Sequence, residues 1–264
     1  MKVFMVTDME GVAGVVSFTD QSYPDGRYYD AGKRLVTGEV NAAVDGLLEA
    51  GVEEVLVWDG HGAGGIDFEE LHPEALLLHG RPSPPWSRMR EVIRRYDAFV
   101  IVGQHAMAGV VTSNQNHTQD SRTVDAYRLN GKLIGEIGQL ALFMGGLGLP
   151  LLFLSGERDA CREAEELVPE VTTVAVKEGL GRGSAISLSA QAARMRIRDG
   201  TAAAIARHRQ KPIAALAWPG PYLLEKRFFH TDRADAEMNK AGAERMDAQS
   251  VRFRSDSILD IIYR

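Results

Sequence analysis

The sequence predicts an α/β protein, with a mostly parallel sheet flanked by helices and a smaller α+β part at the C-terminus. Short apolar, β-branched runs at residues 3–6, 55–57 and 98–102 have the character of strands that are buried on both faces. Stretches with helical spacing of apolar residues, such as 33–50, separate these runs. An alternating order of strands and helices favours right-handed βαβ units and a parallel sheet.

The elements follow in this order. After a strand at 3–6 and a long loop at 12–32, we expect a helix at 33–50, strands at 53–58 and 75–78, a helix at 86–96, a strand at 97–102, a hairpin at 124–132 with an Asn130-Gly131 turn, a helix at 133–146, a strand at 151–154, a helix at 158–168 and a strand at 171–176. Beyond residue 176 the pattern loosens. Glycines 179, 181 and 183 predict a hinge-like loop, followed by a helix at 187–209, strands at 213–218 and 222–231, a helix at 233–243, a strand at 250–253 and a helix at 255–263. We therefore predict two parts, an α/β domain at 1–180 and a smaller α+β part at 181–264.

Composition excludes several classes of protein. The chain has 264 residues and a formal net charge of −6, which argues against general nucleic-acid binding. Its one cysteine, Cys161, cannot form an internal disulfide, as is typical of reducing compartments. The first apolar run is too short for a signal peptide, and no stretch approaches the roughly 20 apolar residues that span a bilayer. We expect a cytoplasmic protein that binds neither nucleic acid nor membrane.

Metal-capable side chains follow three of the predicted strands. Asp8 and Glu10 end the first strand, and in extended geometry both point to the same side. His61 follows the strand at 53–58, and His105 follows the strand at 97–102. Parallel strands end at the same edge of a sheet, where ligands bind in open α/β folds. Two neighbouring carboxylates repel each other unless a cation lies between them, so this edge is a candidate metal site. Glu136, in the first turn of a helix, is a further candidate ligand.

Each residue also has an ordinary structural explanation. Asp8 and Glu10 could form an acidic turn, Glu136 is favoured by the helix dipole, and a histidine after a strand is usually a polar loop residue. Their coincidence at one edge favours a metal site. Mixed carboxylate and imidazole ligands suit Zn²⁺, with Mn²⁺, Co²⁺ or Fe²⁺ as alternatives. Five ligands exceed the needs of one tetrahedral zinc, so one carboxylate could bridge two ions. His117, in a polar loop, is either a catalytic histidine or a solvated loop residue.

The chain resembles the M55 family of D-aminopeptidases. The resemblance is carried by Met5-Val6-Thr7-Asp8-Met9-Glu10-Gly11, Asp59-Gly60-His61, Gly103-Gln104-His105-Ala106, His117-Thr118, and Asn130-Gly131 followed by Gly135-Glu136. It covers most of residues 1–180 and becomes diffuse beyond about 210. It implies a peptidase with two zinc ions per subunit, bound by Asp8, Glu10, His61, His105 and Glu136, with Asp8 as the bridge. It also implies His117 as the catalytic nucleophile and a ring-shaped homodecamer whose active sites face an inner channel.

We therefore expect a di-zinc aminopeptidase that hydrolyses short peptides, with D-residues at the amino end. Residues 1–180 would carry the catalytic site, and 181–264 would complete the pocket and the oligomer contacts. One alternative is another metal-dependent hydrolase, an amidohydrolase or a phosphoesterase. A phosphoesterase should show a basic cluster, whereas Arg122 and Lys132 are the only basic residues near the motifs. The other alternative is a non-catalytic, oligomeric metal-binding protein.

Overall fold

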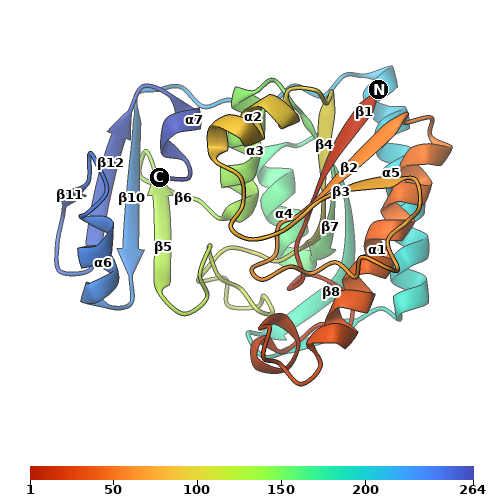
Figure 1. The fold of residues 1–264 in the computed structure, drawn as a ribbon, viewed down its shortest axis with the longest axis horizontal. Coiled ribbons are helices and arrows are strands. Elements are labelled where there is room, and N and C mark those ends of the chain that lie inside the picture. Colours follow the sequence, from red (N-terminus) through yellow and green to blue (C-terminus); the bar gives the residue numbers. More distant parts are fainter.

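The computed structural model describes residues 1–264 and contains two sheets, which lie side by side (Figure 1). The larger sheet has the order β3-β2-β1-β4-β7-β8-β9 and comprises β1 (Lys2–Thr7), β2 (Glu54–Asp59), β3 (Ala75–Leu78), β4 (Ala98–Gln104), β7 (Leu151–Glu157), β8 (Thr172–Gly181) and β9 (Ser184–Ser187). All its neighbouring strands are parallel except β8 and β9. The smaller, antiparallel sheet has the order β11-β12-β10-β5-β6 and comprises β5 (Val124–Leu129), β6 (Lys132–Leu133), β10 (Tyr222–Phe228), β11 (Glu244–Arg245) and β12 (Ser250–Ser255). The predicted α/β fold class is confirmed.

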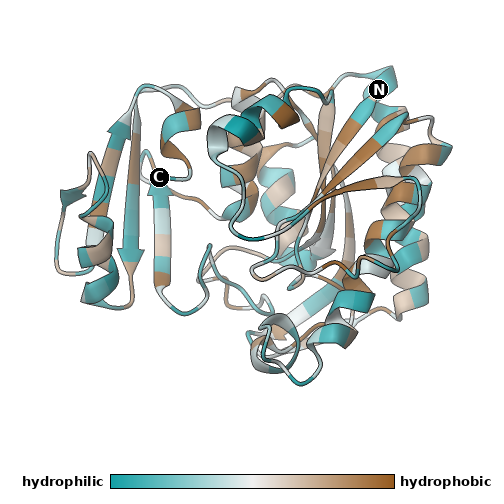
Figure 2. Ribbon diagram, in the orientation of Figure 1, coloured by the Kyte–Doolittle hydropathy of each residue, from teal (hydrophilic) through white to brown (hydrophobic).

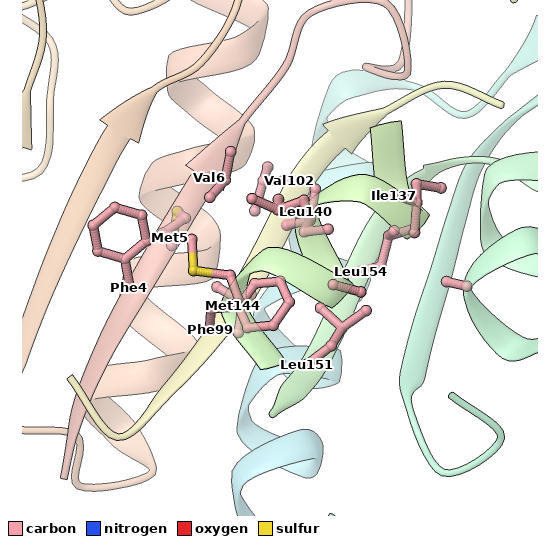
Figure 3. Close-up of a cluster of buried hydrophobic side chains, with 14 of the residues drawn as sticks. Phe4, Met5, Val6, Phe99, Val102, Ile137, Leu140, Met144, Leu151 and Leu154 are labelled. Carbon is pink, nitrogen blue, oxygen red and sulfur yellow. The ribbon is translucent and has the colours of Figure 1, made fainter. Parts of the chain in front are cut away.

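Helices cover both faces of the larger sheet, which is why its central strands β1 and β4 are mostly apolar and almost wholly buried (Figure 2). Two long helices, α1 (Tyr29–Glu49) and α5 (Ala190–Gln210), pack against each other and against this sheet. On the other face, Leu140 and Met144 of α3 (Glu136–Gly146) lie among Met5, Phe99 and Leu154 (Figure 3). The remaining helices are α2 (Trp86–Ile93), α4 (Arg158–Leu167), α6 (Thr231–Glu237) and α7 (Ile258–Ile261). None of the helices is both long enough and apolar enough to cross a bilayer.

Several predicted elements are wrong. Residues 213–218 form no strand, because prolines at 212 and 219 flank the run and its apolar side chains instead pack as a connector. Glycines 179, 181 and 183 are not a hinge-like loop, since they lie in the antiparallel pair β8–β9 and the turn that joins it. The predicted loop at 12–32 contains a π-helical turn, η1 (Phe18–Ser22), and α1 begins at Tyr29 rather than at residue 33.

The two sheets do not coincide with the predicted parts 1–180 and 181–264. Residue 180 lies inside β8, and the next two elements, β9 and α5, belong to the larger sheet and its helical layer. The hairpin β5–β6 lies before residue 180 but pairs with β10 in the smaller sheet. The chain therefore crosses between the sheets more than once, and its C-terminus lies against the smaller sheet, where Lys226 of β10 donates to the Arg264 carbonyl (Figure 1).

Candidate metal centre

The three strands that precede the predicted ligands are neighbours in the sheet. β1 pairs in parallel with β2 on one side and with β4 on the other. Asp8, His61 and His105 therefore emerge at one edge, as the order of elements predicts. The backbone continues this contact beyond the strands, because the Asp8 amide donates to the Val102 carbonyl at 2.9 Å. Adjacent strands thus deliver the three side chains to a common point.

A glycine permits this close approach. Gly103, two residues before His105, has a φ of +85°, in the left-handed region that side chains rarely adopt. A Cβ at this position would lie 2.1 Å from the Asp8 carbonyl oxygen. The conformation of Gly103 and the absence of a side chain there allow the end of β4 to fold against the segment that carries Asp8 and Glu10.

The structure brings all five predicted ligands together. The Asp8 carboxylate lies between two imidazoles, with Oδ1 3.2 Å from His61 Nδ1 and Oδ2 3.2 Å from His105 Nε2. Glu10 Oε2 lies 3.0 Å from the same His61 nitrogen. Glu136 Oε1 lies 3.7 Å from His105 Nε2. Asp8, Glu10, His61 and His105 are buried, so four of the five groups are withdrawn from solvent.

Backbone carbonyls determine which nitrogen of each histidine faces these carboxylates. His61 Nε2 is 2.8 Å from the Ser22 carbonyl, and His105 Nδ1 is 2.8 Å from the Ala106 carbonyl. A carbonyl only accepts, so each of these nitrogens carries the proton. The opposite nitrogens, His61 Nδ1 and His105 Nε2, are left with lone pairs that face carboxylates. This outer hydrogen bonding is typical of metal-ligating histidines.

The electrostatics of the cluster match a site built for cations. Burial disfavours a charged imidazole, but the surrounding carboxylates outweigh it and raise the pKa of His105 to about 10, and that of His61 well above its usual value. Burial likewise opposes ionisation of Asp8, but the two imidazoles hold its pKa well below the ordinary range. Buried His105 Nε2 forms no well-directed hydrogen bond, although carboxylates surround it. A metal ion would supply the positive charge that protons otherwise bring.

His117 lies beside this cluster. Its ring stacks on that of His105, with centroids 3.9 Å apart and an interplanar angle of 18°, and its Nε2 is 3.7 Å from Glu136 Oε1. His117 Nδ1 is 3.0 Å from the Gln115 carbonyl, so it carries the proton and Nε2 is the free base. Burial, and then the charge of His105, lower the pKa of His117. Its geometry suits a neutral base, and the donor atoms of His105, His117 and Glu136 also lie within 4.8 Å of one another.

Known proteins resemble this chain in sequence and in fold. The family model of the M55 peptidases, described as D-aminopeptidase, matches residues 1–263. This chain belongs to the M55 family of D-aminopeptidases. A D-aminopeptidase of Bacillus subtilis (strain 168) is 30% identical over 267 residues, which cover 98% of this chain and 93% of the relative. The solved structure of the Zn-dependent D-aminopeptidase DppA from Bacillus subtilis, described as a self-compartmentalizing protease, is 29% identical, has a TM-score of 0.91, and covers 100% of this chain and 94% of that chain. The resemblance inferred from the motifs is confirmed, and it extends over the whole chain.

A pocket opens over the candidate metal centre of this M55 protein. Its volume is about 600 Å³, and it is lined by Asp8, Glu10, His61, His117 and Glu136 together with residues of neighbouring loops. The C-terminal segment contributes Tyr263 to the wall. The volume of the pocket lies within the usual range of small-molecule binding sites.

Sequence reasoning missed the residues that hold the ligand loops of this M55 site. Arg81 donates to the carbonyls of Asp59 and His61, at 2.9 and 2.8 Å, and so clamps the loop after β2. Asp59 holds the same loop from within, because its carboxylate accepts from the amides of Gly65 and Ile66. Only Asp59 had a sequence signal, its position after a strand. Arg81 lies far from the motifs, and nothing in its surroundings marks it.

Lys177 is a second such residue. It is fully buried, and its Nζ donates to the carbonyls of Glu10 and Val15, at 2.5 and 2.6 Å. Burial lowers its pKa to about 8, against the opposing effect of nearby glutamates. Because Glu10 is a candidate ligand, the ammonium group anchors the backbone of the segment that presents it.

We expect Lys177→Met to lower the free energy of unfolding by about 2–4 kcal/mol, because two charge-assisted hydrogen bonds inside the protein are lost. Divalent-metal affinity should fall about 10–100-fold, as is typical when an outer support of a ligand is removed. Urea unfolding and metal titration measure the two effects. Lys132→Met, at an exposed lysine of β6, is the matched control. An unchanged metal affinity in Lys177→Met would show that the anchor does not serve the site.

Proposed function

We propose that this M55 protein is a zinc-dependent aminopeptidase, and that it uses two zinc ions to hydrolyse short peptides with D-residues at the amino end. One observation carries this proposal: two buried imidazoles, His61 and His105, turn lone pairs toward carboxylates on either side of Asp8. The solved relative is described as a Zn-dependent D-aminopeptidase. The donor set of carboxylates and imidazoles suits zinc.

The arrangement supports two ions rather than one. The two oxygens of Asp8 face different histidines, so Asp8 can bridge. On the His61 side, Glu10 would complete the ligands of the first ion. On the His105 side, Glu136 would complete those of the second. This grouping uses all five carboxylate and imidazole donors and leaves His117 for another role.

When bound, zinc supplies Lewis-acid chemistry, which polarises a carbonyl and acidifies water. The protein's own residues orient the substrate and move the proton. His117 presents an unprotonated Nε2 toward the pocket because its Nδ1 donates to the Gln115 carbonyl. It would act in proton transfer or as the attacking nucleophile. The small pocket limits the substrate to short peptides.

We also propose that the subunits assemble into a homo-oligomer, a ring-shaped decamer with the active sites facing an inner channel. The solved relative is described as self-compartmentalizing, which requires an assembly that encloses its active sites. In this proposal residues 1–180 carry the metal ligands and His117, and residues 181–264 complete the pocket through Tyr263 and contribute oligomer contacts. The expected cytoplasmic location stays a prediction.

The test is hydrolysis of matched D- and L-aminoacyl peptides by the purified protein, before and after treatment with a chelator. We expect turnover of the D-peptides, its loss with the chelator, and its recovery when zinc is returned. Elemental analysis should find two zinc ions per chain. A phosphoester serves as the control substrate. Zinc-dependent cleavage of the phosphoester without cleavage of any peptide would replace the peptidase with a phosphoesterase.

A further inference from the structure

One cation lines the pocket. Among the residues of its wall Arg122 is the single lysine or arginine, whereas five carboxylates are present: Asp8, Glu10, Asp25, Asp120 and Glu136. The chain as a whole carries a net charge of −6. Zinc would balance the charge of Asp8, Glu10 and Glu136, but Asp25 and Asp120 would still repel a negative group of the substrate unless a positive group met it. Arg122 is the group in position to do so.

The backbone of Arg122 is held by a hydrogen bond, and its guanidinium lies over the ring of Tyr23. The guanidinium carbon lies 3.9 Å from the centre of the Tyr23 ring, and the Tyr23 hydroxyl is 2.8 Å from Ser121 Oγ. The Arg122 amide donates to Asp120 Oδ1 at 2.8 Å. The guanidinium is exposed and belongs to none of the salt bridges of the chain, and its side-chain partner is Tyr23. Stacking on Tyr23 thus orients a guanidinium whose remaining N–H donors are open to a ligand.

Aromatic side chains from other elements form an apolar part of the pocket wall. Trp58 at the end of β2, Trp86 at the start of α2 and Tyr263 near the C-terminus all line the pocket. Trp86 stacks on Tyr263 with centroids 4.5 Å apart and an angle of 9°, and Trp58 meets Trp86 edge-on at 6.2 Å. These rings form an apolar wall that suits an aliphatic or aromatic side chain. The pocket thus combines an apolar wall with a cationic rim.

We propose that Arg122 binds a carboxylate of the substrate, so that the enzyme prefers short peptides that carry a free carboxylate close to the scissile bond. This inference rests on the proposed peptidase function and names the substrate class of that site. A guanidinium matches a carboxylate with two parallel hydrogen bonds. The carboxylate has two sources, the free C-terminus of a dipeptide or tripeptide and an acidic side chain after the scissile bond. The apolar wall would take the side chain on the other side of that bond.

The test compares three substrates, D-Leu-Ala, its amide D-Leu-Ala-NH₂, and D-Leu-Glu-NH₂, whose only carboxylate is in the side chain. In the wild type we expect the free acid to have a higher kcat/KM than the amide. In Arg122→Ala the ratio of acid to amide should fall about 10–100-fold, the range for a lost hydrogen bond to a charged group, and mainly through KM. Arg122→Lys should restore part of the ratio. The behaviour of D-Leu-Glu-NH₂ shows whether a side-chain carboxylate is accepted as well.

Arg128→Ala is the matched control, because Arg128 is an exposed arginine of β5 that donates to the Gly131 carbonyl and does not line the pocket. It should keep the wild-type ratio. An equal loss for acid and amide in Arg122→Ala would overturn the proposal, because Arg122 would then only support the loop. Calorimetric binding of the acid and the amide to zinc-loaded His117→Ala protein, with and without Arg122→Ala, decides the matter independently of turnover. If the wild-type protein binds the acid more tightly than the amide but cleaves no peptide, the proposed peptidase function is refuted, whereas the proposed role of Arg122 in binding a carboxylate is not.

Discussion

Replacing His117 with alanine is expected to lower kcat by about 10²–10⁴-fold while zinc content stays at its wild-type level. The imidazole stacks on His105 and presents a free Nε2 to the pocket, but it is not needed to complete the five-donor set around Asp8. The loss therefore falls on proton transfer or nucleophilic attack rather than on metal binding. Steady-state kinetics on a D-aminoacyl peptide and elemental analysis of the same preparation measure both quantities.

His79→Ala is the control for this experiment. His79 stacks on the exposed ring of Phe68 and does not line the pocket, so its removal should leave kcat unchanged. A fall in zinc content in His117→Ala would contradict the proposed role. His117 would then be a ligand together with His105 and Glu136, whose donor atoms lie near its own.

Replacing Asp8 with asparagine is expected to lower zinc content below two ions per chain and to lower kcat by about 10³-fold or more. The asparagine amide has the shape of the carboxylate but lacks its charge. Only the carboxylate offers two anionic oxygens, one on the side of His61 and one on the side of His105, that would bridge two zinc ions. Several kcal/mol of charge stabilisation are lost with the metal, and each 1.36 kcal/mol corresponds to tenfold in rate. Elemental analysis and kinetics at saturating substrate provide the measurement.

Thermal unfolding separates this effect from misfolding. A ligand that binds only the folded state raises stability, so added zinc should raise the Tm of the wild type. Asp8→Asn should fold but lose that increment. Asp25→Asn, at an exposed carboxylate of the pocket rim, should keep both zinc and the increment. Two tightly held zinc ions and normal turnover in Asp8→Asn would refute the bridging assignment.

The sequence predicted the framework of the site because its signals are local. An apolar run that ends in Asp8 and Glu10 marks a buried strand with a polar end, and the runs that precede His61 and His105 do the same. Parallel pairing then places such ends at one edge, as the register of β1 with β2 and β4 shows. Elements whose apolar residues have no clear helical or strand period were predicted poorly. The apolar run at 213–218 resembled a strand, but whether a segment pairs depends on its neighbours in space.

What the sequence determined by itself is the fold class and the set of side chains that gather at the sheet edge, because hydrophobic period and strand order are written into consecutive residues. Only the tertiary structure decided which atoms face one another. The Ser22 carbonyl selects the tautomer of His61, Lys177 reaches the Glu10 carbonyl from a distant strand, and Tyr23 holds Arg122 at the pocket rim. Hydrogen bonds and ring contacts between residues far apart in the chain have no period to read, since they exist only once the strands and loops have packed.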